Sequence, residues 1–359
     1  MSKKVLFFGP YPPPITGQSI AFKEVYDNYE YDKILCNTTH FKDNKVLNTI
    51  YSIFDVTRIF LFKRFDTVYF TCTRSKLGFF KDLYLILWCS VFQKRIVNHL
   101  HGADFITFYE QSGSLKRIIH WAYNKIDVSI VLLSSMQEQF KYFPKMKLTV
   151  VKNSFPSEYK NVSVDIESKK NQVLYLSNLI ESKGILFFME AMDTILKNNS
   201  NVSALIAGKP MGDEYSSENE IYEKFNNLYS SLKEKYQDRI SYSGGITGKA
   251  KEKALSESSI FVLPTFYKTE AFPLTIIEAM RFGNAIITTK HNYLPEVVGQ
   301  QNGLLVIPKS VDSLTQNIQA LIDDSNRLKK IQEYNIQDAL ENYNSDSYLN
   351  QVKNIIISN

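Results

Sequence analysis

Two glutamates stand on either side of a predicted helix start in the second half of the chain. Glu270 precedes the segment AFPLTII and Glu278 follows it, and Pro273 suits a first helical turn because its missing N–H would have no intrahelical partner there. The free N–H groups at residues 272–275 would bind an anion such as a diphosphate, with the positive end of the helix dipole behind them. Carboxylates beside phosphate can instead accept hydrogen bonds from hydroxyl groups, so we expect one glutamate to hold a sugar and the other a ribose.

Basic, glycine and histidine residues follow other predicted strands. Lys183 lies in SNLIESKGI after one strand, Gly17 lies in the proline-rich loop GPYPPPITGQS after another, and His101 follows the strand RIVNH. Loops at the carboxyl ends of parallel strands are where α/β proteins bind their ligands. His99 points to the same face of an ideal strand as His101, so either histidine could be the functional one.

The stretch EAFPLTIIEAM, with Gly283 after it, resembles the signature of the family-4 retaining glycosyltransferases of the GT-B fold. Two glutamates eight residues apart are common, but the intervening Phe-Pro-Leu and the trailing Glu-Ala-Met make the match specific. The resemblance implies an α/β protein with two facing Rossmann-like domains, each with a doubly wound parallel sheet, and a cleft between them. It also implies transfer of a hexose from a nucleotide-diphosphate sugar to a glycan acceptor, with retention of anomeric configuration.

The resemblance also assigns roles to individual residues. It gives catalytic roles to His101, Glu270 and Lys183, and it implies that His101 contacts the donor sugar without acting as a nucleophile. The residues expected to bind the donor are Gly17, Asn178, Lys183, Glu270, Ala271, Phe272, Pro273, Leu274 and Glu278. Gly17 would let the backbone approach the donor phosphates, because glycine can take conformations that other residues avoid.

One position departs from the family pattern. Residues 177–185 resemble a Gly-Arg-x4-Lys-Gly phosphate-binding segment, and Asn178 stands where arginine is usual. Arginine can bind phosphate oxygens bidentately, whereas asparagine brings no charge, and Lys209 could compensate. The departure keeps open a non-catalytic subunit that binds a nucleotide sugar without transferring it. The other alternative is a GT-B-fold nucleotide-sugar epimerase, which would turn over the sugar without an acceptor.

The candidate residues include no DxD motif for a metal-bound diphosphate and no paired carboxylates of the glycosidase type. We therefore expect Lys183, the helix N-terminus and backbone amides to stabilise the leaving diphosphate, without a metal ion or any other cofactor. The segment SGGITGKA comes close to an ATP-binding P-loop, but Ser243 replaces the first required glycine and Ala250 replaces the Ser or Thr. The segment YSGGIT instead resembles the family's loop that contacts the nucleotide base.

Short apolar runs alternate with longer segments of helical period, which is typical of βα units around a parallel sheet. The predicted strands of the first half are residues 5–8, 67–70, 95–99, 128–133 and 148–151. Those of the second half are residues 173–177, 203–207, 240–243, 260–263, 285–288 and 304–306. The polar segment 153–172 is the predicted linker. We expect an N-terminal, acceptor-side domain at residues 1–160, a nucleotide-sugar-binding domain at 161–340, and a helix at 341–359 that could pack back on the N-terminal domain.

Composition and charge exclude several classes of protein. A net charge of +5, from 42 Lys and Arg against 37 Asp and Glu without a long basic run, gives no support for nucleic-acid binding. Three cysteines without a CxxC pair favour a reducing compartment and argue against structural zinc. The longest apolar stretch, residues 83–92, cannot cross a bilayer as a helix. The N-terminal apolar run is too short for a signal peptide, so we expect a cytoplasmic protein.

Apolar residues at helical spacing fill residues 77–92, between Lys76 and Lys94. Packing against the sheet would explain them, because every helix on a parallel sheet needs an apolar face. A second basic and aromatic segment at residues 45–64 also allows contact with a membrane surface. The acceptor could then be a lipid-linked glycan, such as an undecaprenyl-diphosphate-linked one, met by a cytoplasmic protein at the inner face of the membrane.

Overall fold

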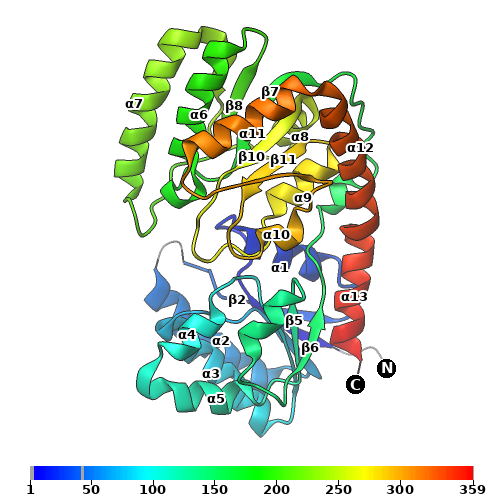
Figure 1. The fold of residues 1–359 in the computed structure, drawn as a ribbon. Coiled ribbons are helices and arrows are strands. Elements are labelled where there is room, and N and C mark those ends of the chain that lie inside the picture. Colours follow the sequence, from blue (N-terminus) through cyan, green and yellow to red (C-terminus); the bar gives the residue numbers. More distant parts are fainter. Residues whose placement is uncertain (1–3, 42–43, 359) are drawn as a thin grey trace. The chain divides into compact units, whose positions relative to one another are not determined.

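The computed structural model describes residues 4–41 and 44–358, which form two compact units (Figure 1). Unit 1 comprises Met1–Asn153 with Ser345–Asn359, and unit 2 comprises Ser154–Asn344. Each unit contains one six-stranded parallel sheet covered by helices. Among the described residues, no helix is both long and apolar enough to span a bilayer.

The sheet of unit 1 has the strand order β2-β1-β3-β4-β5-β6. Its strands are β1 (Val5–Gly9), β2 (Lys33–Asn37), β3 (Thr67–Phe70), β4 (Arg95–His99), β5 (Val128–Val131) and β6 (Lys147–Val150). Its helices are α1 (Gly17–Asp27), α2 (Lys45–Phe62), α3 (Lys76–Val91), α4 (Phe105–Glu110), α5 (Lys116–Tyr123) and α13 (Ser345–Ile357). Helix α2 packs on α3 and α3 on α5, whereas α1 packs on α13.

The core of unit 1 is built from both ends of the chain. Strands β1 and β3 are buried at every position, as expected for parallel strands that are covered on both faces. Helix α13 places Tyr348, Val352 and Ile356 in the same cluster as Val5 and Phe7. The last helix therefore completes the core that the first strand begins.

The sheet of unit 2 has the strand order β12-β11-β10-β7-β8-β9, which winds outward in both directions from its first strand. Its strands are β7 (Lys170–Leu176), β8 (Ser203–Ala207), β9 (Ile240–Tyr242), β10 (Ser258–Leu263), β11 (Ala285–Thr289) and β12 (Gly303–Val306). Its helices are α6 (Ile185–Asn198), α7 (Glu218–Tyr236), α8 (Gly248–Glu257), α9 (Leu274–Arg281), α10 (Leu294–Val297), α11 (Val311–Asp323) and α12 (Ser325–Asn342).

The predicted α/β organisation with two doubly wound parallel sheets is confirmed, and all eleven predicted strands are present. Strand β2 was not predicted. Its sequence, KILCN, is bounded by polar residues, and it lies at the edge of the sheet beside β1, where a continuous apolar run is not required. The predicted linker 153–172 contains a short 3-10 turn, Ser157–Tyr159, and β7 already begins at Lys170 within it.

Candidate functional site

The chain order of unit 2 reverses between β7 and β10, which lie side by side in the sheet. Their parallel pairing places Val173 opposite Ile260, so both strands end at the same edge. The loop after β7 leads to α6, whereas the loop after β10 leads to α9. Open α/β sheets bind ligands outside the carboxyl ends of their strands at such a reversal. The two loops are therefore the first place to look for a site.

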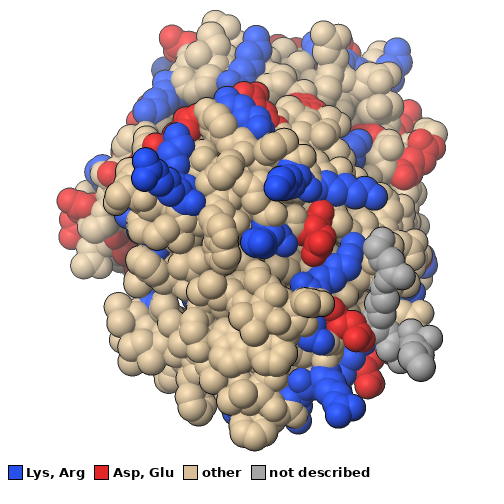
Figure 2. Space-filling model, turned by 90° about the horizontal axis from the view of Figure 1, so that it is seen from below, with Lys and Arg blue, Asp and Glu red and all other residues tan. Residues whose placement is uncertain are grey.

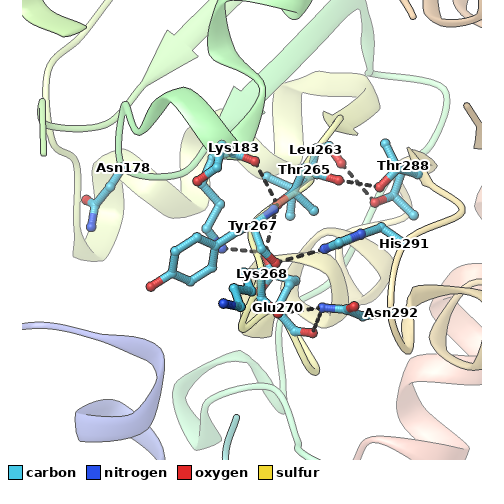
Figure 3. Close-up of polar contacts among 12 residues, drawn as sticks. Asn178, Lys183, Leu263, Thr265, Tyr267, Lys268, Glu270, Thr288, His291 and Asn292 are labelled. Atoms are coloured by element: carbon cyan, nitrogen blue, oxygen red, sulfur yellow. Dashed lines mark hydrogen bonds and ion pairs between the residues drawn. The ribbon is translucent and has the colours of Figure 1, made fainter. Parts of the chain in front are cut away.

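Lys183 and Glu270 meet at this reversal (Figure 3). The ammonium of Lys183 donates a hydrogen bond to Oε2 of Glu270 and lies 5.1 Å from the centre of the Tyr267 ring. Oε2 of Glu270 also accepts a hydrogen bond from Oγ1 of Thr265 at 3.1 Å. Both charged side chains are largely buried. The structure thus joins two of the three predicted catalytic residues in one ion pair.

The loop after β10 is tied to the loop that carries Lys183. The N–H of Phe266 donates a hydrogen bond to the carbonyl oxygen of Ser182 at 2.7 Å. Gly184 has a φ of +81°, and a Cβ at this position would overlap with the carbonyl oxygen of Pro264. Only glycine combines this backbone conformation with so close an approach. The glycine after Lys183 is therefore required for the two loops to touch.

Side chains from the loop after β11 hold the other side of the Glu270 loop (Figure 3). Nδ2 of Asn292 donates a hydrogen bond to the carbonyl oxygen of Glu270 at 3.0 Å. Nε2 of His291 lies 2.9 Å from the carbonyl oxygen of Tyr267. Neither side chain was predicted as part of the site, because a bond to a backbone carbonyl leaves no pattern in the sequence. Their role is to fix the loop that presents Glu270.

Helix α9 begins at Leu274, and no side chain caps its first turn. The helix start was predicted near Pro273, and Pro273 lies at the cap position directly before it. The first N–H groups of a helix lack intrahelical acceptors and carry the positive end of the dipole, so this end suits an anion. The side chains of Ala271 and Phe272 are buried, and Phe272 packs edge-on against Tyr343. A donor could therefore meet Ala271 and Phe272 only through their backbone.

Glu278 is buried in unit 2 and paired with Lys251 of α8. The ammonium of Lys251 lies 2.7 Å from Oε1 and 2.6 Å from Oε2 of Glu278, whose residue exposure is only 1%. Burial raises the pKa of Glu278 above its ordinary value, and Lys251 opposes that rise. Lys251 was not predicted as part of the site. Any ribose bound by Glu278 would share the carboxylate with this lysine.

Asn178 stays apart from the pair of Lys183 and Glu270 (Figure 3). Nδ2 of Asn178 lies 3.9 Å from Sδ of Met211, in the next loop of the same edge. Lys209, the possible substitute for the family's arginine, is exposed at the end of β8. The structure therefore places Asn178 in the expected loop without joining its side chain to the charged pair.

Two histidines of unit 1 lie near the carboxyl end of β4, with ring centres 4.1 Å apart. His99 is fully buried, and its Nδ1 is 2.7 Å from the hydroxyl of Tyr69, so it belongs to the core. His101 is half-buried, and its Nε2, like that of His99, has no hydrogen-bond partner in the described part of the chain. Burial, with Arg74 nearby, lowers the pKa of His101 to about 3. His101 is therefore a neutral imidazole at neutral pH with one nitrogen unused.

Arg74 and Asp104 form an ion pair beside His101, with 2.5 Å between Nε and Oδ1. Arg74 follows β3 and His101 follows β4, and these strands are paired neighbours. A Cβ on Gly102 would overlap with the guanidinium of Arg74, so the arginine covers this backbone closely. The pair was not predicted, because nothing in the sequence marks Arg74 as close to the histidine.

Gly17 is the first residue of α1. The N–H of Ser19 donates to Oγ1 of Thr16 at 3.1 Å, and the N–H of Thr16 donates to Oγ of Ser19 at 2.8 Å, which closes the helix end. Gly17 does not have a positive φ, so the expected reason for glycine at this position is wrong. A Cβ there would meet no atom within 4 Å. What glycine provides is open space beside the backbone.

The edge of unit 2 suits an anionic ligand that carries hydroxyl groups. Lys183 and the start of α9 offer positive charge, and Glu270 offers carboxylate oxygens. A diphosphate would compete with Glu270 for the lysine and free the carboxylate to accept a hydroxyl. Across residues 4–41 and 44–358, no group of three or more His, Cys, Asp or Glu is placed to hold a metal ion.

Comparison with known proteins assigns the chain to a family. Residues 158–338 match the family described as Glycosyl transferases group 1. An uncharacterized glycosyltransferase of Methanocaldococcus jannaschii is 24% identical over 194 residues, which cover 54% of this chain and 46% of the relative. The lipopolysaccharide 1,2-N-acetylglucosaminetransferase of Salmonella typhimurium is 24% identical over 213 residues, which cover 56% of this chain and 55% of the relative. The chain thus spans about half the length of these curated relatives.

A solved structure shares the fold of this chain. HepE (Alr3699) of Anabaena, in complex with UDP, matches with a TM-score of 0.74 at 16% identity, over 98% of this chain and 99% of that one. The two parallel sheets are those of the GT-B fold, as predicted. The matched range includes Lys183 and Glu270, which meet at the edge of the sheet of unit 2, and Glu278, which lies in α9. This chain belongs to the glycosyl transferases group 1 family.

Proposed function

We propose that the protein is a family-4 retaining glycosyltransferase that moves a hexose from a nucleotide-diphosphate sugar to a glycan acceptor. The observation that carries the proposal is the ion pair of Lys183 and Glu270, directly before the uncapped start of α9. A cation and a helix N-terminus at one edge suit the charge that develops on a departing diphosphate. HepE was solved with UDP, so uridine diphosphate sugars are the first donors to test.

Four of the predicted residues have a defined task in this proposal. Lys183 leaves Glu270 to bind the diphosphate, and Glu270 then accepts a hydrogen bond from the donor sugar. Glu278, held by Lys251, accepts hydrogen bonds from the ribose. His101 contacts the sugar as a neutral imidazole. The acceptor hydroxyl attacks the anomeric carbon on the face from which the phosphate departs, and its proton passes to the departing phosphate oxygen, so no protein nucleophile is needed. Lys183 and the start of α9 stabilise the diphosphate in this proposal, in place of a metal ion or other cofactor.

The acceptor would belong to surface polysaccharide or glycoconjugate assembly. The Salmonella relative is named for transfer of N-acetylglucosamine to lipopolysaccharide. We extend this to a lipid-linked glycan acceptor, for example one carried by undecaprenyl diphosphate, because such carriers are substrates for polysaccharide assembly. An enzyme with this acceptor would work in the cytoplasm at the inner face of the membrane.

A non-catalytic subunit that binds a nucleotide sugar is the second candidate. The observation in its favour is Asn178, which brings no charge to the phosphate site and contacts Met211 instead. Such a subunit would bind the donor and transfer nothing.

A panel of nucleotide sugars, offered with and without lipid-linked glycan acceptors, tests the proposal. Mass spectrometry of the products detects transfer, and nuclear magnetic resonance determines the anomeric configuration. Transfer with retained configuration is the expected result. Binding without turnover would identify the non-catalytic subunit, isomerisation of the sugar without acceptor would identify an epimerase, and inversion would exclude the family-4 assignment.

A further inference from the structure

Helices α2 and α3 carry apolar side chains on their solvent side as well as against the sheet. On α2 the exposed apolar residues Leu47, Ile50, Phe54 and Leu61 recur three, four or seven positions apart along one face, and Phe62 follows at the end of the helix. On α3 the exposed apolar residues follow the same spacing and are Leu77, Phe80, Leu87 and Val91. Phe54 is 64% exposed and Leu61 is 59% exposed. Packing on the sheet therefore explains the buried side of each helix and leaves the outer side unexplained.

The two outer sides form one surface, because the helices pack against each other within unit 1. The hydroxyls of Thr57 and Tyr84 are 2.7 Å apart, and the rings of Phe60 and Trp88 have centres 5.4 Å apart. We call this surface, made of the exposed residues of α2 and α3, the α2/α3 face. Contiguous exposed apolar areas of this kind usually mark an interaction site.

The charges of the α2/α3 face have one sign. The only carboxylates on the two helices are buried: Asp55 pairs with Arg58 at 2.6 Å, and Asp82 accepts a hydrogen bond from the N–H of Thr73 at 2.7 Å. The exposed cations at the helix ends are Lys45, Lys63, Arg64 and Lys76. In the described part of the chain, none of these four has a carboxylate partner. Figure 2, which looks from below, where α2, α3 and α5 are labelled in Figure 1, shows a broad area without charged side chains, bordered on one side by Lys and Arg side chains with some Asp and Glu among them.

A hollow at the C-terminal ends of α2 and α3 is lined by both apolar and cationic side chains. Its volume is about 280 Å³, and its lining includes Phe62, Phe65, Phe92, Lys63, Arg64 and Lys94. The ammonium of Lys94 donates to the carbonyl oxygen of Phe65 at 2.6 Å, which holds it in the wall. A second hollow shares Lys94 and adds three cations, Arg95, Lys125 and Lys147, together with one carboxylate, Asp127. These walls suit a phosphate whose attached chain is apolar.

We infer that the α2/α3 face binds the surface of a membrane that contains anionic phospholipids. The apolar side chains enter the boundary between headgroups and acyl chains, and the unpaired cations meet the lipid phosphates. A second copy of the chain fits less well, because a two-fold dimer would bring this face against itself and its cations together. The inference rests on the proposed function in one respect: membrane binding would bring the enzyme to a lipid-linked acceptor.

Sedimentation of the full chain with vesicles, in the absence of donor and acceptor, tests the inference. Vesicles that mix phosphatidylglycerol with phosphatidylcholine should bind the protein, and pure phosphatidylcholine should bind it far less. Reversing two cations with Lys63→Glu and Arg64→Glu should weaken binding at least about thirtyfold, because each lost cation removes roughly 1 kcal/mol and the new carboxylates are repelled by the anionic lipid. Phe54→Ser with Leu61→Ser should weaken it about tenfold or more, because exposed apolar area no longer enters the interface.

Matched variants in unit 2 serve as controls. Ile307→Ser changes an apolar residue that is 60% exposed, and Arg327→Glu with Lys330→Glu reverses one exposed arginine and one exposed lysine. Equal losses in test and control variants, or equal binding to both kinds of vesicle, would overturn the inference. So would a concentration-dependent dimer in light scattering that the α2/α3 variants abolish. Nucleotide-sugar binding is measured separately by calorimetry. The vesicle result can therefore be interpreted even if the proposed function is wrong.

Discussion

The ammonium of Lys183 is hydrogen-bonded to the carboxylate of Glu270, although the two residues are 87 positions apart in the chain. They meet because β7 and β10 are parallel neighbours at the reversal of the sheet, and each residue lies in the loop that follows one of these strands. Each side chain therefore offsets part of the charge that the other presents to a ligand. Changing either residue should alter the behaviour of both.

Lys183→Ala should reduce transfer far more than Asn178→Ala. Loss of a preorganised cation beside a developing negative charge typically lowers the rate about a hundredfold or more, whereas one neutral hydrogen bond contributes about 1 kcal/mol. Transfer would be measured at saturating donor, with circular dichroism as the folding control. Equal damage from the two variants, or a nearly silent Lys183→Ala, would mean that other residues build the phosphate site.

Glu278→Gln should weaken both the fold and donor binding, and Lys251 allows the two effects to be separated. The single variant leaves Lys251, whose side chain is 17% exposed, without its carboxylate, and breaking such a pair costs at most about 3 to 5 kcal/mol of unfolding free energy. Lys251→Met combined with Glu278→Gln should recover most of that stability. Donor affinity in calorimetry should stay about tenfold to a hundredfold lower in the double variant. Recovery of full affinity would remove Glu278 from the ribose site.

Gly184→Ala and Gly17→Ala should separate a structural glycine from one that leaves room. Alanine at Gly184 meets the Pro264 carbonyl in a left-handed backbone conformation, so we expect a loss of at least about 2 kcal/mol in urea unfolding and weaker donor binding. Alanine at Gly17 meets no atom, so stability should change by less than about 1 kcal/mol. A drop in donor affinity for Gly17→Ala would support its predicted place beside the donor phosphates, and unchanged affinity would count against it.

The free energy of unfolding should fall as the pH drops below the ordinary pKa of histidine. Burial lowers the pKa of His101 to about 3, against about 6.5 in the unfolded chain, so between these values the unfolded state binds a proton that the folded state does not. Burial also lowers the pKa of His99 well below its usual value. His101→Gln should flatten the decline in urea titrations. If the free energy of unfolding falls with pH as steeply in His101→Gln as in the unmodified protein, the pKa of His101 is not lowered by folding.

Transfer should survive an excess of EDTA. The proposed charge stabilisers are Lys183 and the start of α9, and no described cluster of carboxylates, histidines or cysteines is placed to hold a metal ion. Rates before and after chelation, at fixed ionic strength, provide the measurement. Complete loss of activity that magnesium or manganese restores would replace this mechanism with metal-assisted departure of the diphosphate.

Several of the supporting residues could not be predicted from sequence. Lys251 is identified only by its contact with Glu278, and Asn292 only by its bond to a backbone carbonyl. Such partners are set by which loops and helices come together, and neither residue belongs to a motif. The same holds for Arg74, which covers the backbone beside His101 from a different strand end.

The sequence by itself determined the two parallel α/β sheets, the helix start after Pro273 and the loops that carry Lys183, Glu270 and His101. Periodicity, proline and glycine act over a few residues, so these features are readable without a structure. The tertiary structure decided that His99 is fully buried in the core whereas His101 is only half-buried, and that Asn178 lies apart from the charged pair. It also decided that the outer side of α2 and α3 stays exposed. Burial and ion pairing depend on contacts between distant segments, which the order of residues alone does not specify.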